Sequence, residues 1–132
     1  MKGSPDVTRG WLNKANHDLE GARKLLELEG PYDLVCFHCQ QAVEKYMKGL
    51  LDWHGTPFPF THDLALLGPL CKAADPVLVF ANPDVFRLSD YAVKLRYDSV
   101  FNPTRDEAAQ ALAIAQRVCG EIADRLPPNA KP

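Results

Sequence analysis

The strongest pattern in the sequence lies between residues 32 and 53, where apolar and polar side chains separate onto two sides of a helix. At about 100° per residue, one side collects Tyr32, Val35, Cys36, Cys39, Ala42, Val43, Tyr46, Met47, Leu50 and Trp53. The other side collects Phe37, His38, Gln41, Glu44, Lys45 and Lys48. The pattern predicts a long helix with its first side in a core, while the second side meets solvent, a partner or a ligand.

The polar side of this helix has two interpretations. Glu44 precedes Lys48 by four residues, and Gln41 precedes Lys45 by four. Pairs with this spacing stabilise an exposed helix by about 0.2–0.5 kcal/mol each, so they favour an ordinary solvated face. Phe37 favours the other interpretation, because a large apolar ring beside donors and acceptors is typical of an interface or of the rim of a ligand site.

Four further segments have the apolar spacing of helices. The first begins near residue 6 or 8 and ends at Gly30-Pro31, because glycine supplies a left-handed C-terminal position and proline cannot continue a helix. The segment from residue 54 to residue 60 contains one glycine and two prolines and is predicted to be a loop. The remaining helices are predicted at residues 61–74 with Thr61 as cap, at 82–98 from the Asn82-Pro83-Asp84 start, and at 104–126 from a Thr104/Glu107 capping box.

No segment alternates with the period of two that a strand requires. The pattern predicts an all-α fold, an antiparallel up-and-down helical bundle of four long helices plus one short helix. The chain has 132 residues, of which 46% are hydrophobic and 24% charged. These values are typical of one ordinary domain, so we expect a single domain over residues 1–132, with its core at about 8–126 and flexible termini.

Charge and hydropathy limit the partners. The formal net charge is -2, so the chain lacks the basic excess that binds duplex nucleic acid or an anionic membrane. Any contact with RNA or a nucleotide must therefore be local. No run approaches about 18 apolar residues, and none follows Lys2. We expect a cytoplasmic protein that makes no membrane contact.

Four cysteines raise the question of a metal or redox site: Cys36, Cys39, Cys71 and Cys119. The first two form a CxxC pair around His38, but structural zinc needs a second ligand pair. A redox CxxC opens a helix, whereas this one lies inside a helical pattern. Both cysteines fall on the apolar side, so we expect them to pack as small buried hydrophobes. No metal site and no cofactor is predicted.

Four segments, taken in order, resemble a HEPN domain, the nucleotide-binding domain of higher eukaryotes and prokaryotes. They are Trp11 to Leu19, residues 37–48, Thr61-His62-Asp63-Leu64 and Arg96-Tyr97. The resemblance spans about residues 8–125, and the run Gln-Gln-Ala-x-Glu-Lys-x-x-Lys is its most specific part. It implies a bundle that usually forms a homodimer. It also implies the branch that works beside a minimal nucleotidyltransferase, on the same chain or encoded next to it.

Many HEPN domains are ribonuclease toxins that use an arginine followed four to six residues later by a histidine, brought together across the dimer. Here the pattern is broken, because no histidine follows Arg96 and His62 is the last histidine of the chain. Imidazole is the side chain best suited to moving a proton near neutral pH, and the phenol and carboxyl types at Tyr97 and Asp98 ordinarily titrate far from it. The resemblance therefore implies a binding domain without catalytic residues.

Three functional hypotheses follow. The first is a non-catalytic homodimer that binds nucleotide or RNA and acts with a nucleotidyltransferase partner, in a system like a toxin–antitoxin pair. Its predicted site comprises Phe37, His38, Gln41, Glu44, Lys45, Lys48, Arg96 and Tyr97. The second is a metal-independent endoribonuclease in which Arg96 stabilises the phosphate and Tyr97, Asp98 or His38 replaces the missing histidine. The third is a purely structural partner in a dimer or hetero-complex, with Phe37 and the polar side of the helix as its interface.

Plain structural roles are open for three of these positions. Arg96 has the alternative of a salt bridge inside the bundle, to Asp18 or Glu44. His38 has the alternative of a hydrogen-bonded histidine on a helix face. His62 has the alternative of a local contact at a helix start.

Overall fold

The computed structural model describes residues 3–132, which form five α-helices and one short 3-10 helix. The long helices are α1 (Pro5–Glu27), α2 (Tyr32–His54), α4 (Asn82–Tyr97) and α5 (Arg105–Asp124), and the shorter elements are α3 (Leu64–Ala74) and η1 (Pro128–Ala130). No strand occurs within this range. The predicted all-α bundle of four long helices and one short helix is confirmed. Residues 1 and 2, part of the terminus predicted to be flexible, lie outside the described range.

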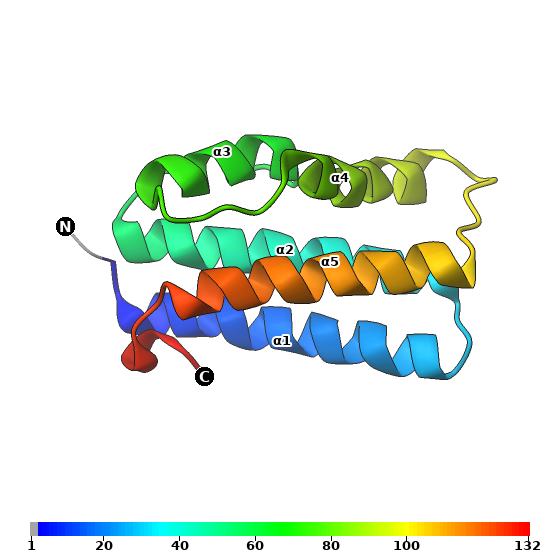
Figure 1. Ribbon diagram of the computed structural model, residues 1–132, viewed down its shortest axis with the longest axis horizontal. Coiled ribbons are helices and arrows are strands. Elements are labelled where there is room, and N and C mark those ends of the chain that lie inside the picture. Colours follow the sequence, from blue (N-terminus) through cyan, green and yellow to red (C-terminus); the bar gives the residue numbers. More distant parts are fainter. Residues whose placement is uncertain (1–2) are drawn as a thin grey trace.

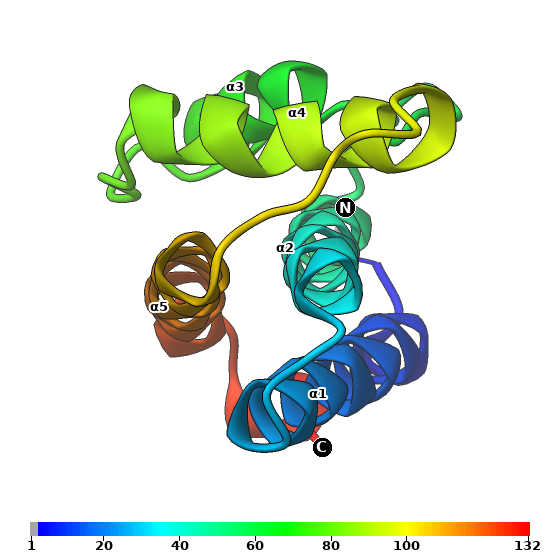
Figure 2. The same cartoon turned by 90° about the vertical axis from the view of Figure 1, so that its right-hand side faces the viewer.

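Helix α2 is the centre of the bundle and contacts each of the other α-helices. In Figure 1, α1, α2 and α5 run along the long axis, and α3 and α4 form a layer above them. Figure 2 shows α5 on one side of α2 and α1 below it. On the side of α2 away from α5, none of the described helices lies between α1 and the α3–α4 layer. One side of the central helix is therefore left for polar side chains.

Side-chain caps explain where α5 and α3 begin. Thr104 and Glu107 form the predicted capping box, in which each backbone N–H donates to the other side chain at 3.1 Å. The cap predicted for α3, however, was wrong. Asp63 takes this place, since its carboxylate accepts from the N–H of Ala65 at 2.9 Å, and Thr61 instead accepts from the N–H of Asp63 at 3.0 Å.

Two other helix boundaries differ from the prediction by one residue. At the end of α1, Glu29 takes the left-handed conformation (φ 64°) and Gly30 follows with φ 113°. The N–H of Gly30 donates to the carbonyl of Leu25 at 2.8 Å, which satisfies the last turn. Helix α4 begins at Asn82 itself, and no side chain in the described part of the chain caps it. The Asn82 side chain accepts instead from Lys72 at 3.0 Å.

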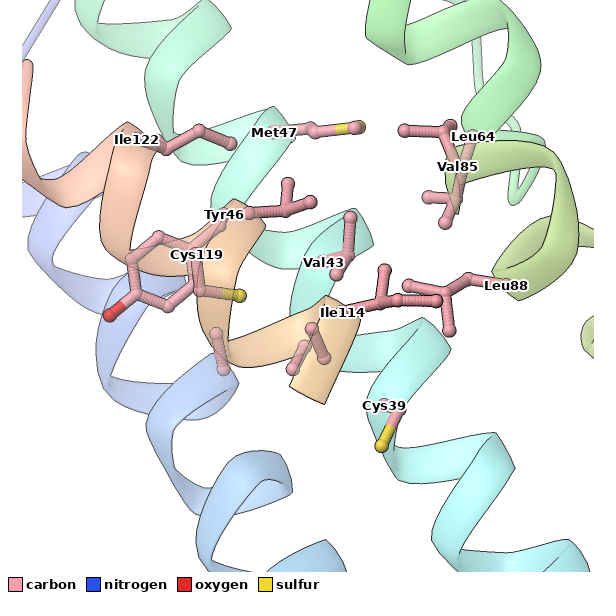
Figure 3. Close-up of a cluster of buried hydrophobic side chains, with 14 of the residues drawn as sticks. Cys39, Val43, Tyr46, Met47, Leu64, Val85, Leu88, Ile114, Cys119 and Ile122 are labelled. Atoms are coloured by element: carbon pink, nitrogen blue, oxygen red, sulfur yellow. The ribbon is translucent and has the colours of Figure 1, made fainter. Parts of the chain in front are cut away.

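The predicted apolar side of α2 forms the middle of the core. All but its two end residues are buried, and Tyr32 and Trp53 are partly buried at the ends. Figure 3 shows Val43 and Met47 between two groups of side chains. One group comes from α3 and α4 and comprises Leu64, Val85 and Leu88; the other comes from α5 and comprises Ile114, Cys119 and Ile122. Burial of such side chains stabilises the fold by about 1.5–3 kcal/mol each.

Helices α1 and α2 approach closely at Gly49. A β-carbon built at this position would lie 2.7 Å from Cδ1 of Leu12 and 3.2 Å from Cβ of Trp11. The buried hydroxyl of Thr8 donates to the Gly49 carbonyl at 3.0 Å. The contact between these helices thus depends on the absence of a side chain at residue 49.

We expect Gly49→Val to lower the free energy of unfolding by about 1–3 kcal/mol, because the added carbons overpack the contact with α1. Gly120→Ala is the matched control, since its built β-carbon has no atom of the described residues within 4 Å apart from its chain neighbours and the nearby backbone of α5. Alanine there should stabilise α5 by about 0.5–1 kcal/mol. Urea unfolding followed by circular dichroism measures both, and equal effects of the two variants would contradict the close-contact argument.

Candidate functional site

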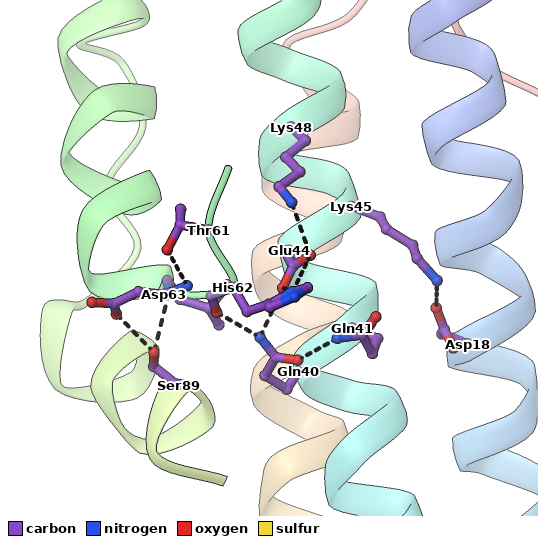
Figure 4. Close-up of polar contacts among 11 residues, drawn as sticks. Asp18, Gln40, Gln41, Glu44, Lys45, Lys48, Thr61, His62, Asp63 and Ser89 are labelled. Carbon is purple, nitrogen blue, oxygen red and sulfur yellow. Dashed lines mark hydrogen bonds and ion pairs between the residues drawn. The ribbon is translucent and has the colours of Figure 1, made fainter. Parts of the chain in front are cut away.

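The polar side of α2 contains a buried network rather than a solvated surface. Gln40 is fully buried, and Glu44 and Lys48 are 3% and 5% exposed. The Glu44 carboxylate accepts from Lys48 Nζ at 3.0 Å and from Gln40 Nε2 at 3.2 Å. It also lies 3.0 and 3.2 Å from Nδ1 of His62 (Figure 4). For Glu44 and Lys48 the interpretation as a solvated helix face was therefore wrong.

Aromatic rings surround the ammonium group of Lys48. Its Nζ lies 5.7 Å from the ring centroid of Trp11, 6.0 Å from that of Phe58 and 5.9 Å from that of Phe60. Ring faces attract a cation at these distances. Phe58 and Phe60 belong to the segment between α2 and α3. The buried ion pair and its rings therefore fasten this segment to α2.

His62 joins the same segment to α2 by two bonds. Its ring bonds to Glu44, and its carbonyl accepts from Gln40 Nε2 at 3.0 Å. From the sequence, the structural alternative for His62 was a local contact at the start of α3. The ring contacts α2 instead, 18 positions back along the chain.

A second polar cluster links α2 to α1. Asp18 is 9% exposed and accepts from Lys45 Nζ at 2.6 Å, and its other oxygen lies 2.8 Å from His38 Nδ1. His38 is therefore a hydrogen-bonded histidine on a helix face, which was its structural alternative. The Phe37 ring packs edge-on against His38 with centroids 5.6 Å apart. The predicted support of Lys45 by Gln41 is replaced by the bond to Asp18, since Gln41 donates to its neighbour Gln40.

Arg96 and Tyr97 lie at the end of α4 and are exposed. Within residues 3–132, the Arg96 guanidinium makes no hydrogen bond or ion pair. The alternative of a salt bridge to Asp18 or Glu44 was wrong, because those carboxylates already hold lysine and histidine side chains. Five donor N–H groups of a guanidinium are left available to a ligand.

Arg96 and Tyr97 line a pocket of about 570 Å³. One wall is formed by the segment that leads into α3, with Phe60, Thr61, His62 and Asp63, and by Ala65 in the first turn of α3. The other wall is α4, with Phe86, Ser89, Asp90, Ala92, Val93, Arg96 and Tyr97. The fold therefore brings His62 into the same pocket as Arg96, 34 positions later in the sequence.

The charged side chains that line this pocket differ in whether another side chain pairs with them. The Asp63 carboxylate caps α3 and accepts from the hydroxyl of Ser89 at 3.0 Å. Asp90 pairs with Lys94 at 2.9 Å. Arg96 is the charged side chain of the lining that has no such partner among residues 3–132.

Exposed rings complete the lining of the pocket. Phe60 is 97% exposed, Phe86 56% and Tyr97 81%. Aromatic rings stack on nucleobases, and a guanidinium with vacant donors binds phosphate in a bidentate manner. The arrangement offers one anchor for a phosphate and several surfaces for a base.

The predicted site is thus divided by the fold. Arg96 and Tyr97 line the pocket, whereas Phe37, His38, Gln41 and Lys45 belong to the α2 surface, where His38 and Lys45 bond to Asp18. Glu44 and Lys48 are buried, and Glu44 reaches the pocket through His62. Sequence reasoning missed Asp18, Gln40 and His62 as members of these clusters. The available signals were the first glutamine of the Gln40-Gln41 pair and the Thr61-His62-Asp63-Leu64 segment.

Cys36, Cys39, Cys71 and Cys119 are buried, as predicted for the first two. Burial raises the pKa of the Cys36 and Cys71 thiols to about 12, because a thiolate would lose its hydration, and it also raises the pKa of Cys39 and Cys119. Within residues 3–132 no three His, Cys, Asp or Glu side chains gather in a way that would hold a metal ion. No helix in the same range has the length and apolar content to cross a bilayer.

Comparisons with known proteins agree with the resemblance seen in the sequence. The model of the HEPN domain family matches residues 8–125. The crystal structure of TT1696 from Thermus thermophilus is similar, with a TM-score of 0.76, 30% identity and coverage of 90% of this chain and 98% of that one. ST0689, described as an archaeal HEPN homologue, gives a TM-score of 0.69 at 26% identity, over 95% and 98% of the two chains. No curated protein matches the chain.

We expect Glu44→Ala to lower the free energy of unfolding by about 3–5 kcal/mol, because Lys48 would remain buried without its counter-ion. Glu27→Ala is the control, since its pair with Arg23 is exposed on both sides and contributes little. Urea unfolding measures both variants. Similar small losses in the two would show that the Glu44 pair behaves as a surface pair.

Proposed function

The chain belongs to the HEPN family, and from this premise we propose that it is a non-catalytic module that binds a nucleotide or RNA. The observation that carries this proposal is Arg96, a guanidinium without a partner among residues 3–132, in a pocket lined by exposed rings. The phosphate of the ligand would lie on Arg96. A base would stack on Tyr97, Phe60 or Phe86.

The size of the pocket supports a small ligand or a short stretch of a chain. Its volume of about 570 Å³ lies within the range of pockets that hold nucleotide-sized molecules, about 300–1,000 Å³. The net charge of -2 favours few phosphate contacts. We therefore expect weak binding with a shallow dependence on salt, since each neutralised phosphate adds to the salt slope.

The same proposal includes a homodimer and a nucleotidyltransferase partner in the cytoplasm, in a system like a toxin–antitoxin pair. The family resemblance is the support for both partners. Exposed apolar side chains on α4 give further support for a protein contact, because they stay open to solvent in the single chain. They are Phe86, Val93 and Tyr97.

The endoribonuclease alternative is favoured by one observation, the presence of His62 in the pocket of Arg96. His62 was not among the replacements considered from the sequence. Of those, Tyr97 lines the pocket, whereas His38 bonds to Asp18 and Asp98 accepts from the N–H of Val100 at 3.1 Å. In this alternative His62 would carry out the proton transfer of RNA cleavage, because a guanidinium such as that of Arg96 stays protonated.

We expect Arg96→Ala to weaken binding of a short single-stranded RNA by about 10-fold or more, because charge-assisted bonds to phosphate are lost. Fluorescence anisotropy at low salt measures the affinity. Arg87→Ala is the matched control: it removes an exposed arginine from the same helix, but Arg87 bonds to Gln110 and lies outside this pocket.

Equal losses in the two arginine variants would contradict a site at Arg96. Electrophoresis of the same RNA after incubation with chelator tests the alternative. We expect no cleavage that depends on Arg96, whereas cleavage abolished by both Arg96→Ala and His62→Ala would favour the ribonuclease.

Light scattering at micromolar concentration should give the mass of two chains. We expect Phe37→Ala and Val93→Glu to shift the protein toward one chain, the first by removing a contact ring and the second by placing a charge in an apolar interface. Val79→Glu is the control, since Val79 is 80% exposed in the segment between α3 and α4. A single-chain mass for the unchanged protein would contradict the dimer. A dimer that binds no RNA would instead favour the purely structural partner.

A further inference from the structure

We infer that His62 is a ligand-contacting residue of this pocket and that the pocket takes a phosphodiester when the His62 ring is protonated. The inference rests on the proposed function, since it concerns the same pocket. It adds a second polar residue that contacts the ligand, the class of ligand and the dependence of binding on protons.

The buried network fixes the position of the proton on the neutral His62 ring. Nδ1 lies 3.0 and 3.2 Å from the two oxygens of Glu44. The same carboxylate accepts from Lys48 and Gln40. A carboxylate that pairs with an ammonium only accepts hydrogen bonds, so Nδ1 must be the nitrogen that carries the proton.

The remaining nitrogen, Nε2, makes no hydrogen bond among residues 3–132 and is not one of the buried polar atoms that lack a partner there, so it keeps contact with solvent. Figure 4 shows the imidazole extending from its segment toward Glu44 on α2. The His62 side chain is still 41% exposed, although Glu44 covers its Nδ1. Nε2 is therefore the ring nitrogen that is open to a ligand, in a residue that lines the pocket.

This arrangement makes the ring selective for the charge of its ligand. A neutral ring with its proton on Nδ1 presents the lone pair of Nε2, which repels the oxygens of a phosphate because both are acceptors. A protonated ring presents an N–H and a positive charge, which bind them. Arg96 is a donor at every pH, so His62 decides whether the pocket has one cation or two.

Several charged or titratable groups bond to the His62–Glu44 pair or line the same pocket. From α2 they are Glu44 and Lys48, from its own segment Asp63, and from α4 Asp90, Arg96 and Tyr97. Imidazole is the side-chain type in this set that ordinarily changes charge between about pH 5 and pH 8. A dependence of binding on pH in this range is therefore attributed to His62.

His38 provides an internal control. Its Nδ1 lies 2.8 Å from Asp18, so it has the same bond between imidazole and carboxylate. It is not part of the pocket lining. If histidine charge affected RNA affinity through the protein as a whole, replacing either histidine would change the dependence of affinity on pH. If it acts through the pocket, only replacement of His62 will change it.

The test is anisotropy with a 2′-O-methylated hexanucleotide that has no terminal phosphate, so that the probe keeps a constant charge and resists cleavage. At fixed ionic strength, we expect the affinity of the unchanged protein to fall by about 10-fold from pH 5.5 to pH 8. His62→Gln should bind as weakly at low pH as the unchanged protein does at high pH, with a flat profile. His38→Gln should keep the unchanged profile.

Nitrogen-15 NMR of the unchanged protein provides a second measurement that needs no variant. At pH 8 we expect the His62 ring to carry its proton on Nδ1, and a proton on Nε2 would overturn the inference. A flat pH profile in the unchanged protein, or a pH dependence that survives in His62→Gln, would also overturn it. If the inference fails in one of these ways but the unchanged protein binds the RNA and Arg96→Ala does not, the proposed function still stands. No binding at any pH would overturn the proposed function and the inference with it.

Discussion

The carboxylate of Glu44 is the group on which the functional side of the molecule depends. A charge buried in a helical bundle is tolerated only if ions and hydrogen-bond donors compensate for its lost hydration. Lys48 and Gln40 supply these from the same helix, and His62 supplies a third contact from the segment before α3. Because the third contact comes from a distant segment, this compensation also fixes one wall of the pocket.

The same pairing of charges explains why Arg96 is available. Two carboxylates lie against or on the polar side of α2, and each is satisfied by a lysine of α2 and by a histidine. Asp18 of α1 is held by Lys45 and His38, and Glu44 of α2 by Lys48 and His62. The arginine at the end of α4 is then left without an internal anion among residues 3–132. An unpaired guanidinium keeps its donors for an external ligand, and here it stands beside exposed rings.

Much of the fold could be predicted because helices are encoded locally. The repeat of apolar residues placed α2 and its core side correctly, and the Thr104 capping box was read directly from four residues. The errors were small and occurred where several residues offered the same function, as at α3, where Asp63 rather than Thr61 is the cap. The candidate site was harder, because its members were assigned to one helix face although the fold distributes them between two clusters and a pocket.

The sequence by itself determined the helices, the buried side of α2 and the family, since each depends on residues a few positions apart or on a specific run of them. It also indicated the Glu44–Lys48 pair at helical spacing. Tertiary structure alone decided that this pair is buried, that Lys45 bonds to Asp18 rather than Gln41, and that His62 shares a pocket with Arg96. The physical reason is that hydration and partners depend on which helices cover a side chain, and this follows from contacts between distant parts of the chain.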